Sequence, residues 1–125
     1  MAKLSLVQTF ASKFTSQIPD PDKAGVVRKY EFTVRFKLYP QTEEKQDELK
    51  RIQEDRGNYG FLDHVLDSVI ELPKDVELVD ETGAEISPEE WIKLHLIVQN
   101  DAVVAFWEVI SKGVLEKNSK RSRSR

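Results

Sequence analysis

The sequence predicts an α+β protein in which a small antiparallel sheet is covered by helices. Three observations predict this class. Residues 26–39 alternate apolar and charged side chains, residues 42–57 form a polar run with capping residues at both ends, and residues 87–110 carry two helical apolar patterns. The chain has 125 residues, 39% of them hydrophobic and 33% charged, which suits one domain with one core.

The alternating stretch is the clearest strand of the sequence. A two-residue period places one set of side chains on each face of a strand. The apolar set is Val26, Tyr30, Phe32, Val34, Phe36 and Leu38, interrupted by Arg28, and the polar set is Lys29, Glu31, Thr33, Arg35 and Lys37. This pattern predicts a half-buried strand, with one wet face and one face that the helices must cover.

The segment before this strand permits two interpretations. Apolar residues three to four apart favour a short amphipathic helix over residues 4–18, whereas its serines and threonines also permit an extended arm. In the extended form, residues 14–18 form the first half of a hairpin. Pro19, Pro21 and Gly25 predict a turn between this segment and the central strand.

The middle of the chain predicts two helices and a small hairpin. A polar helix begins after Thr42 as N-cap and ends at Gly57. An apolar stripe over residues 61–70 predicts a core helix stopped by Pro73, and residues 76–86 predict a hairpin with its turn at Thr82-Gly83.

Ser87-Pro-Glu-Glu90 is the sharpest local signal, because it combines an N-cap serine, proline at the first helical position and the glutamate of a capping box. The helix that follows is predicted to form a helical hairpin with a second helix, which starts at Asn100 or Asp101 and ends at Gly113. Residues 1–116 are therefore predicted to form one α+β domain with an amino-terminal arm, and residues 117–125 a disordered basic tail.

Charge is distributed unevenly. The net charge is −3, but five lysines and arginines fall in the last nine residues, so residues 1–116 carry −8. An acidic body repels nucleic acid, and the tail has no aromatic residue for base stacking, so nucleic acid binding is not expected. No segment has the run of about 18 apolar residues that a membrane span needs, so a soluble protein is expected.

The sequence gives no pattern for catalysis, a metal or a cofactor. Cysteine is absent, and His64 and His95 lie on different predicted helices without metal-binding spacing. The five glycines are scattered over turns and caps and form no phosphate loop. We expect no enzyme activity.

The order of these elements resembles the tail assembly chaperones of long-tailed (siphophage-type) bacteriophages. The resemblance covers residues 26–112 and is carried by Phe32-Thr-Val-Arg-Phe36, the polar helix, Val79-Asp-Glu-Thr-Gly83 and Ser87-Pro-Glu-Glu-Trp91. It implies a non-enzymatic protein of the host cytoplasm that binds the tape measure protein, self-associates and recruits the tail tube protein during tail assembly. A long apolar client would need a groove for amphipathic helices. We expect this partner-binding groove to be lined by Trp91, Leu94, Phe106, Trp107 and Ile110.

Two other function classes stay open at this point. One is a small regulatory or nucleic-acid-associated binding module that uses its basic tail, whose affinity would fall steeply with salt. The other is an enzyme with a polar site assembled only in the fold.

Overall fold

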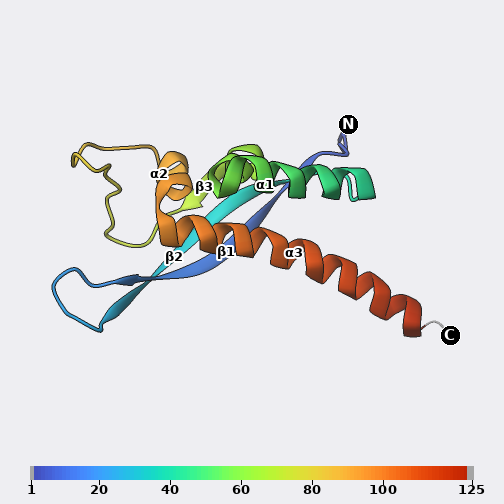
Figure 1. The fold of residues 1–125 in the computed structure, drawn as a ribbon. Coiled ribbons are helices and arrows are strands. Elements are labelled where there is room, and N and C mark those ends of the chain that lie inside the picture. Colours follow the sequence, from blue (N-terminus) through green and yellow to red (C-terminus); the bar gives the residue numbers. More distant parts are fainter. Residues whose placement is uncertain (1, 124–125) are drawn as a thin grey trace.

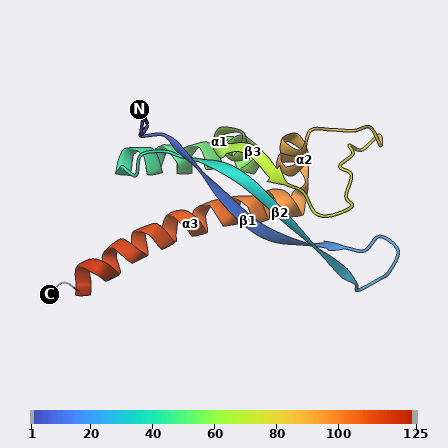
Figure 2. The same cartoon turned by 180° about the vertical axis from the view of Figure 1, so that it is seen from behind.

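The computed structural model describes residues 2–123, with side chains described for residues 2–112. Its elements in order are β1 (Gln8–Pro19), β2 (Val27–Leu38), α1 (Glu43–Val65), β3 (Leu66–Glu71), α2 (Pro88–Leu94) and α3 (Leu96–Arg123). The strands form an antiparallel sheet in the order β1-β2-β3 (Figure 1). From behind, the strands lie in front of the helices, so the helices cover one face of the sheet (Figure 2). The predicted α+β class is confirmed.

Strand β2 follows the predicted alternation. Phe32, Val34 and Phe36 are at most 1% exposed, whereas Glu31 and Arg35, which belong to the alternate set, are exposed. Because the inward set is aromatic and β-branched, it supplies a continuous apolar surface for the helices. The outward face of the sheet remains wet, as predicted.

Strand β1 corrects the helical interpretation of residues 4–18 and confirms the hairpin. It pairs with β2 from Gln8↔Leu38 to Pro19↔Val27. Phe14 stacks on Phe32 with ring centroids 5.6 Å apart. Since cross-strand aromatic pairs stabilise a sheet and burial rewards them, tertiary packing decides this segment in favour of the strand.

Helix α1 contains the predicted polar helix and the first part of the predicted core helix. Thr42 caps its start, because its hydroxyl accepts the backbone N–H of Lys45 at 3.2 Å. Gly57 interrupts it with φ 70° and ψ −172°, so the predicted end of the polar helix is seen as a kink. The predicted core helix over 61–70 is wrong beyond Val65, because Leu66–Glu71 forms β3 and pairs with β2. Strand β3 completes the hydrogen bonding of β2 on its second side, which a helix there would leave unpaired.

The predicted hairpin over residues 76–86 is reduced to one bridge between Val79 and Glu85, outside the sheet. Ser87 caps α2, with its hydroxyl accepting the N–H of Glu90 at 3.2 Å. Helix α3 starts at Leu96, earlier than the predicted Asn100 or Asp101, and its backbone continues past Gly113 to Arg123. The predicted disordered tail, 117–125, lies outside the residues with described side chains, and 124–125 lie outside the described chain altogether.

Phe106 of α3 lies at the centre of the core. Its ring contacts Phe36 and Phe61 edge-on, with centroids 5.4 Å away in both cases, and Phe10 at 6.1 Å. These partners come from β2, α1 and β1, so one side chain joins the sheet to two helices. This packing fixes how α3 is rotated and therefore which of its residues reach the surface.

Candidate partner-binding surface

Helices α2 and α3 meet at a sharp corner made by one residue, His95. Its backbone N–H donates to Trp91 O at 2.9 Å, closing α2, and its carbonyl accepts Gln99 N–H at 2.8 Å, opening α3. Its ring Nδ1 accepts the N–H of Val98 at 3.3 Å, which is the bond of a helix N-cap. The Gln99 side chain also donates to the carbonyl of Lys93. His95 is thus the C-cap of one helix and the N-cap of the next.

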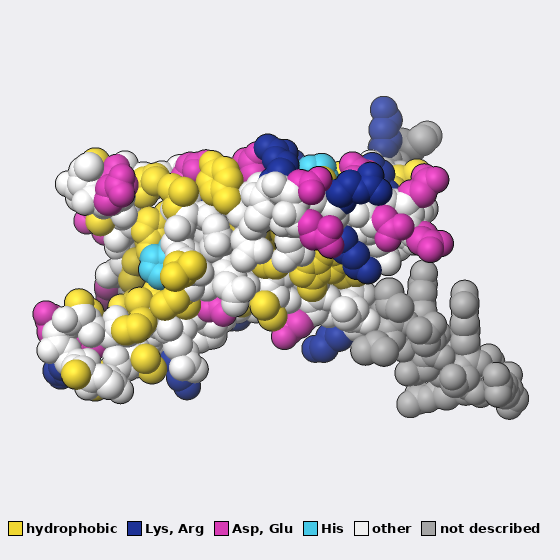
Figure 3. All heavy atoms as spheres, viewed as in Figure 1, with side chains coloured by type: hydrophobic (Ala, Val, Ile, Leu, Met, Phe, Trp, Pro, Cys, Tyr) yellow, Lys and Arg dark blue, Asp and Glu magenta, His cyan; other side chains and the backbone are white. Residues whose placement is uncertain are grey.

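This corner turns two leucines outward. Leu94 is 60% exposed and Leu96 is 80% exposed, on either side of His95. Exposed leucines occur singly on most proteins, but here the exposed Val79 lies across a hollow from Leu94. We call this set, Leu94, Leu96, Trp91 and Val79, the corner surface. Figure 3 shows hydrophobic side chains gathered over α2 and the neighbouring loop.

Two hollows of about 370 Å³ each adjoin the corner surface. Trp91 and His95 line both, so their stacked rings, with centroids 4.6 Å apart, form a wall between them. The first hollow is also lined by apolar Val79, Ile86 and Leu94 and by acidic Asp80 and Glu81. The second is also lined by Ile18, Tyr30, Phe32, Val76 and Leu78 and by acidic Asp75 and Glu77. Both hollows therefore combine apolar walls with acidic residues, which suits a side chain that is apolar near the backbone and basic at its tip.

Helix α2 is held in place by a charged network. Lys93 Nζ lies 3.0 Å from Asp63 of α1 and 3.0 Å from Glu90, and Glu90 also accepts the Tyr59 hydroxyl at 2.9 Å. Burial alone lowers the pKa of Lys93, but hydrogen bonds to Glu90 and Asp63 raise it above its ordinary value. The hydrogen bond from Lys93 lowers the pKa of both carboxyls. The ionised network holds α2 against α1, so α2 presents Trp91 and Leu94 of the corner surface in a fixed position.

A second apolar surface lies between α1 and α3. Trp107 is half-buried, stacks on Phe61 at 5.4 Å and donates its indole N–H to Gln53 Oε1 at 3.1 Å. A hollow of about 610 Å³ adjoins it, lined also by Val103 and Val104. Trp107 is eleven residues along α3 from Leu96, which is about 16 Å at the rise of an α-helix. The two surfaces are therefore separate.

The structure distributes the five residues expected to line one groove over three environments. Trp91 and Leu94 lie together at the corner surface. Trp107 lies at the second surface, and Ile110 is half-buried against the core. Phe106 is 1% exposed and sealed in the core, so it cannot line a groove. Helical spacing placed these residues near one another along the chain, but the rotation of α3 about Phe106 separates them in space.

Sequence reasoning missed Leu96 and the role of His95. Histidine is an ordinary helix residue, so the sequence predicted no break at His95 and placed the start of the second helix at Asn100 or Asp101. The available signal was the Leu94-His95-Leu96 triplet, whose two apolar residues two apart do not share a helix face.

Within the described part of the chain, no helix combines the length and apolar character needed to cross a membrane. Nor does any group of three or more histidine, aspartate and glutamate side chains there come together as a metal site. Comparison with protein-family models, curated proteins and solved structures finds no match to this chain.

Acidification is expected to loosen the corner through His95. Burial lowers the pKa of His95 below its ordinary 6.5, so the fold favours the neutral ring. The stabilisation is complete above that value and is lost as pH falls through the lowered pKa, because a protonated Nδ1 cannot accept the Val98 N–H. Losing such a cap costs about 0.5–2 kcal/mol. Urea denaturation at about pH 7.5 and about pH 5.5 measures the loss.

His95→Asn is the matched variant for this experiment, since asparagine caps helices without titrating. The variant should lose less stability than the wild type over the same interval. His64, whose pKa burial also lowers, is present in both proteins and cancels in the comparison. Equal losses in the two proteins would show that His95 does not act as a pH-sensitive cap.

Proposed function

We propose that this protein is a non-catalytic assembly chaperone that binds another polypeptide through the corner surface. Its client would be an amphipathic helix, whose apolar side chains cover Leu94 and Leu96 and whose basic side chains reach the acidic residues at the two hollows. The observation that carries the proposal is the exposure of Leu94 and Leu96 beside the Trp91–His95 wall, where α2, fixed by its charged network, meets α3.

The resemblance to phage tail assembly chaperones supplies the identity of the client. On this proposal the chain binds the tape measure protein in the host cytoplasm, associates with further copies of itself and helps to recruit the tail tube protein. An aggregation-prone helical client is protected when a soluble partner covers its apolar stripe. The acidic body, with its net charge of −8 over residues 1–116, keeps such a complex soluble.

On this proposal we expect a tape measure gene beside the gene for this chain. The test is binding of purified segments of that gene's product, measured by titration. Leu94→Asp with Leu96→Asp is expected to weaken binding at least tenfold, because burying one leucine is worth about 1.5–3 kcal/mol and each 1.4 kcal/mol is a factor of ten. The matched control is Val26→Asp, which places the same kind of charge on a 43% exposed valine in the turn between β1 and β2, outside both hollows of the corner.

Unchanged binding by the double variant would remove the corner surface from the proposal. Absence of a tape measure gene in the neighbourhood would remove the phage client. A loss of binding in the Val26→Asp control equal to that of the double variant would show a general charge effect.

A further inference from the structure

Strand β1 leaves one edge of the sheet open. The sheet order is β1-β2-β3, and β1 pairs with β2 along all twelve of its residues. At the end of this hairpin the Asp20 N–H donates to Val26 O at 2.8 Å. Because hydrogen-bonded positions alternate along an antiparallel pair, the backbone groups of the even-numbered residues of β1 bond to β2. Backbone groups alternate in direction along a strand, so Thr9, Ala11, Lys13, Thr15 and Gln17 direct their N–H and C=O groups to the open edge. An open edge of this kind is a template for another strand.

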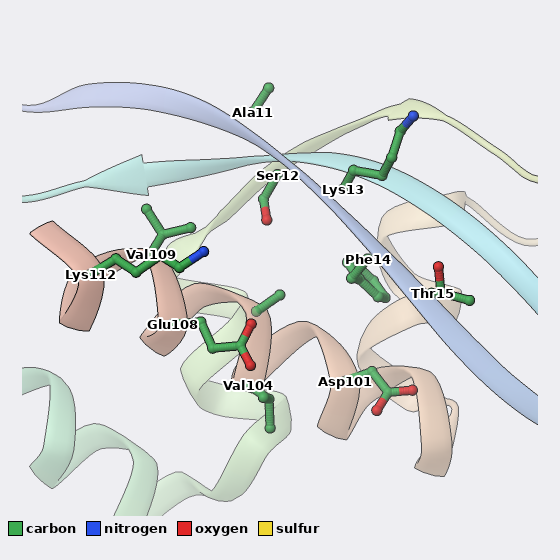
Figure 4. A pocket seen from close by; sticks show the side chains of 11 residues that line it. Ala11, Ser12, Lys13, Phe14, Thr15, Asp101, Val104, Glu108, Val109 and Lys112 are labelled. Atoms are coloured by element: carbon green, nitrogen blue, oxygen red, sulfur yellow. The ribbon is translucent and has the colours of Figure 1, made fainter.

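A hollow of about 510 Å³ lies beside this edge, between β1 and α3. Ser12 and Phe14 point from β1 toward the helix, whereas Ala11, Lys13 and Thr15 point to the other face (Figure 4). Val104 and Val109 of α3, which line the hollow, are 46% and 39% exposed. A strand added at the edge would therefore bring its inward side chains over two uncovered valines.

The arm that precedes β1 carries side chains suited to this position. Leu4 is 91% exposed and Leu6 is 83% exposed, and they are two residues apart, as strand side chains on one face must be. The arm bends at Leu6 and Val7. The side-chain hydrogen bonds that the structure describes for it are local, with Ser5 Oγ accepting the N–H of Val7 at 3.1 Å and Ser5 O accepting the Gln8 side-chain amide. It leaves the sheet beside the start of α1 (Figures 1 and 2).

We propose that two copies of this chain exchange these arms, each arm adding as an antiparallel strand to the open edge of the partner copy's β1. The arm cannot do this within its own copy, because it continues directly into β1 and would have to reverse within a few residues. A twofold axis at Thr9 pairs residue 4 with residue 14 and residue 6 with residue 12 of the other copy. This register places both leucines over the hollow, which β1 lines with residues 11–15.

Neighbouring registers are less favourable. An axis one residue earlier would set Lys3 opposite Lys13, and like charges directly opposite destabilise a strand pair. An axis one residue later would carry Leu4 opposite Ser16, beyond the hollow. With the axis at Thr9, the two copies of residue 13, beside which the α3 helices lie, are about 27 Å apart along the strands, which exceeds the roughly 8–10 Å between the axes of packed helices.

The inference deepens the self-association in the proposed function, but its test does not use the client. The first measurement is the mass in solution by sedimentation, where the wild type is expected at twice the 14.4 kDa of one chain. Leu4→Ser with Leu6→Ser is expected to give the single-chain mass. The matched control is Leu96→Ser, which alters a leucine of similar exposure and should leave the mass doubled.

A cysteine at the axis tests the register. The chain has no cysteine, so Thr9→Cys introduces one thiol per copy. Opposed residues of a hydrogen-bonded pair have Cα atoms about 5.5 Å apart, within the range for a disulfide. Oxidation should cross-link Thr9→Cys to a dimer, while Thr33→Cys on the central strand should stay uncross-linked.

A wild type of single-chain mass, a dimer that survives Leu4→Ser with Leu6→Ser, or equal cross-linking of the two cysteine variants would overturn the proposal. Loss of client binding alone would not affect it.

Discussion

Replacing Phe106 with alanine is expected to lower the free energy of unfolding by about 3–5 kcal/mol, the usual cost of deleting a buried aromatic ring. The ring is 1% exposed and contacts Phe36, Phe61 and Phe10, so the cavity would open where α1, α3 and the sheet meet. Urea denaturation measures the loss as a lower midpoint at unchanged slope.

Trp107→Ala is the matched comparison, because the neighbouring side chain is half-buried and keeps only part of its contact area in the core. Its loss should be clearly smaller than that of Phe106→Ala. If Trp107→Ala costs as much or more, then α3 is rotated differently from the arrangement described here, and the division between core and surface on this helix is wrong.

The second large effect is expected at Gly57, where replacement by alanine should cost about 1–3 kcal/mol of stability. The residue has φ 70° and ψ −172°, a conformation that side chains with a Cβ atom rarely adopt. Among the described residues, no atom outside the glycine and its two chain neighbours lies within 4 Å of the position that a Cβ would occupy, so the cost is conformational and involves no clash. Thermal or urea unfolding gives the value.

Lys50→Ala, an exposed substitution in the first half of α1, is the control and should be close to neutral. A Gly57→Ala protein as stable as this control would mean that α1 can continue straight through residue 57. In that case the kink that directs Phe61 and Leu62 into the core would not depend on glycine.

The sequence predicted β2 correctly because its apolar residues recur every two positions, a spacing that fits a strand and does not fit a helix. Strand β1 was ambiguous for a definite reason. Phe10, Phe14 and Ile18 are four residues apart, a spacing that lies on one face of a helix and also on one face of a strand. The choice between them is made by pairing with β2, which is a long-range contact that local periodicity does not contain.

Strand β3 shows the same limit more strongly. Phe61, Leu62 and Val65 are buried on α1, and the apolar stripe continues through Leu66 and Val69 without a break in pattern. The chain changes from helix to strand at Leu66 because β2 offers a free edge there. Capping residues were more dependable, since Thr42 and Ser87 both act as predicted through local bonds.

The corner surface was predicted in part. Trp91 and Leu94 were identified as partner-binding candidates from residue type and spacing, but their exposure depends on where α2 ends. That end is set by hydrogen bonds of His95 and Gln99 on both sides of the corner. Which aromatic residue of α3 is sealed in the core depends on packing against three other elements, and no local pattern distinguishes Phe106 from Trp107.

The central claim is that the protein acts by offering apolar surface to another polypeptide. The most direct measurement is the affinity for the tape measure protein segment at about 50 mM and about 500 mM salt. Apolar contact at the corner surface, with a small contribution from exposed ion pairs at the hollows, predicts an affinity that falls by less than about tenfold. A negative heat-capacity change on binding is expected to accompany it. The claim would be contradicted if affinity fell a hundredfold or more between the two salt concentrations, and if the Leu94→Asp with Leu96→Asp variant showed the same fall. Binding would then be assigned to the charged groups.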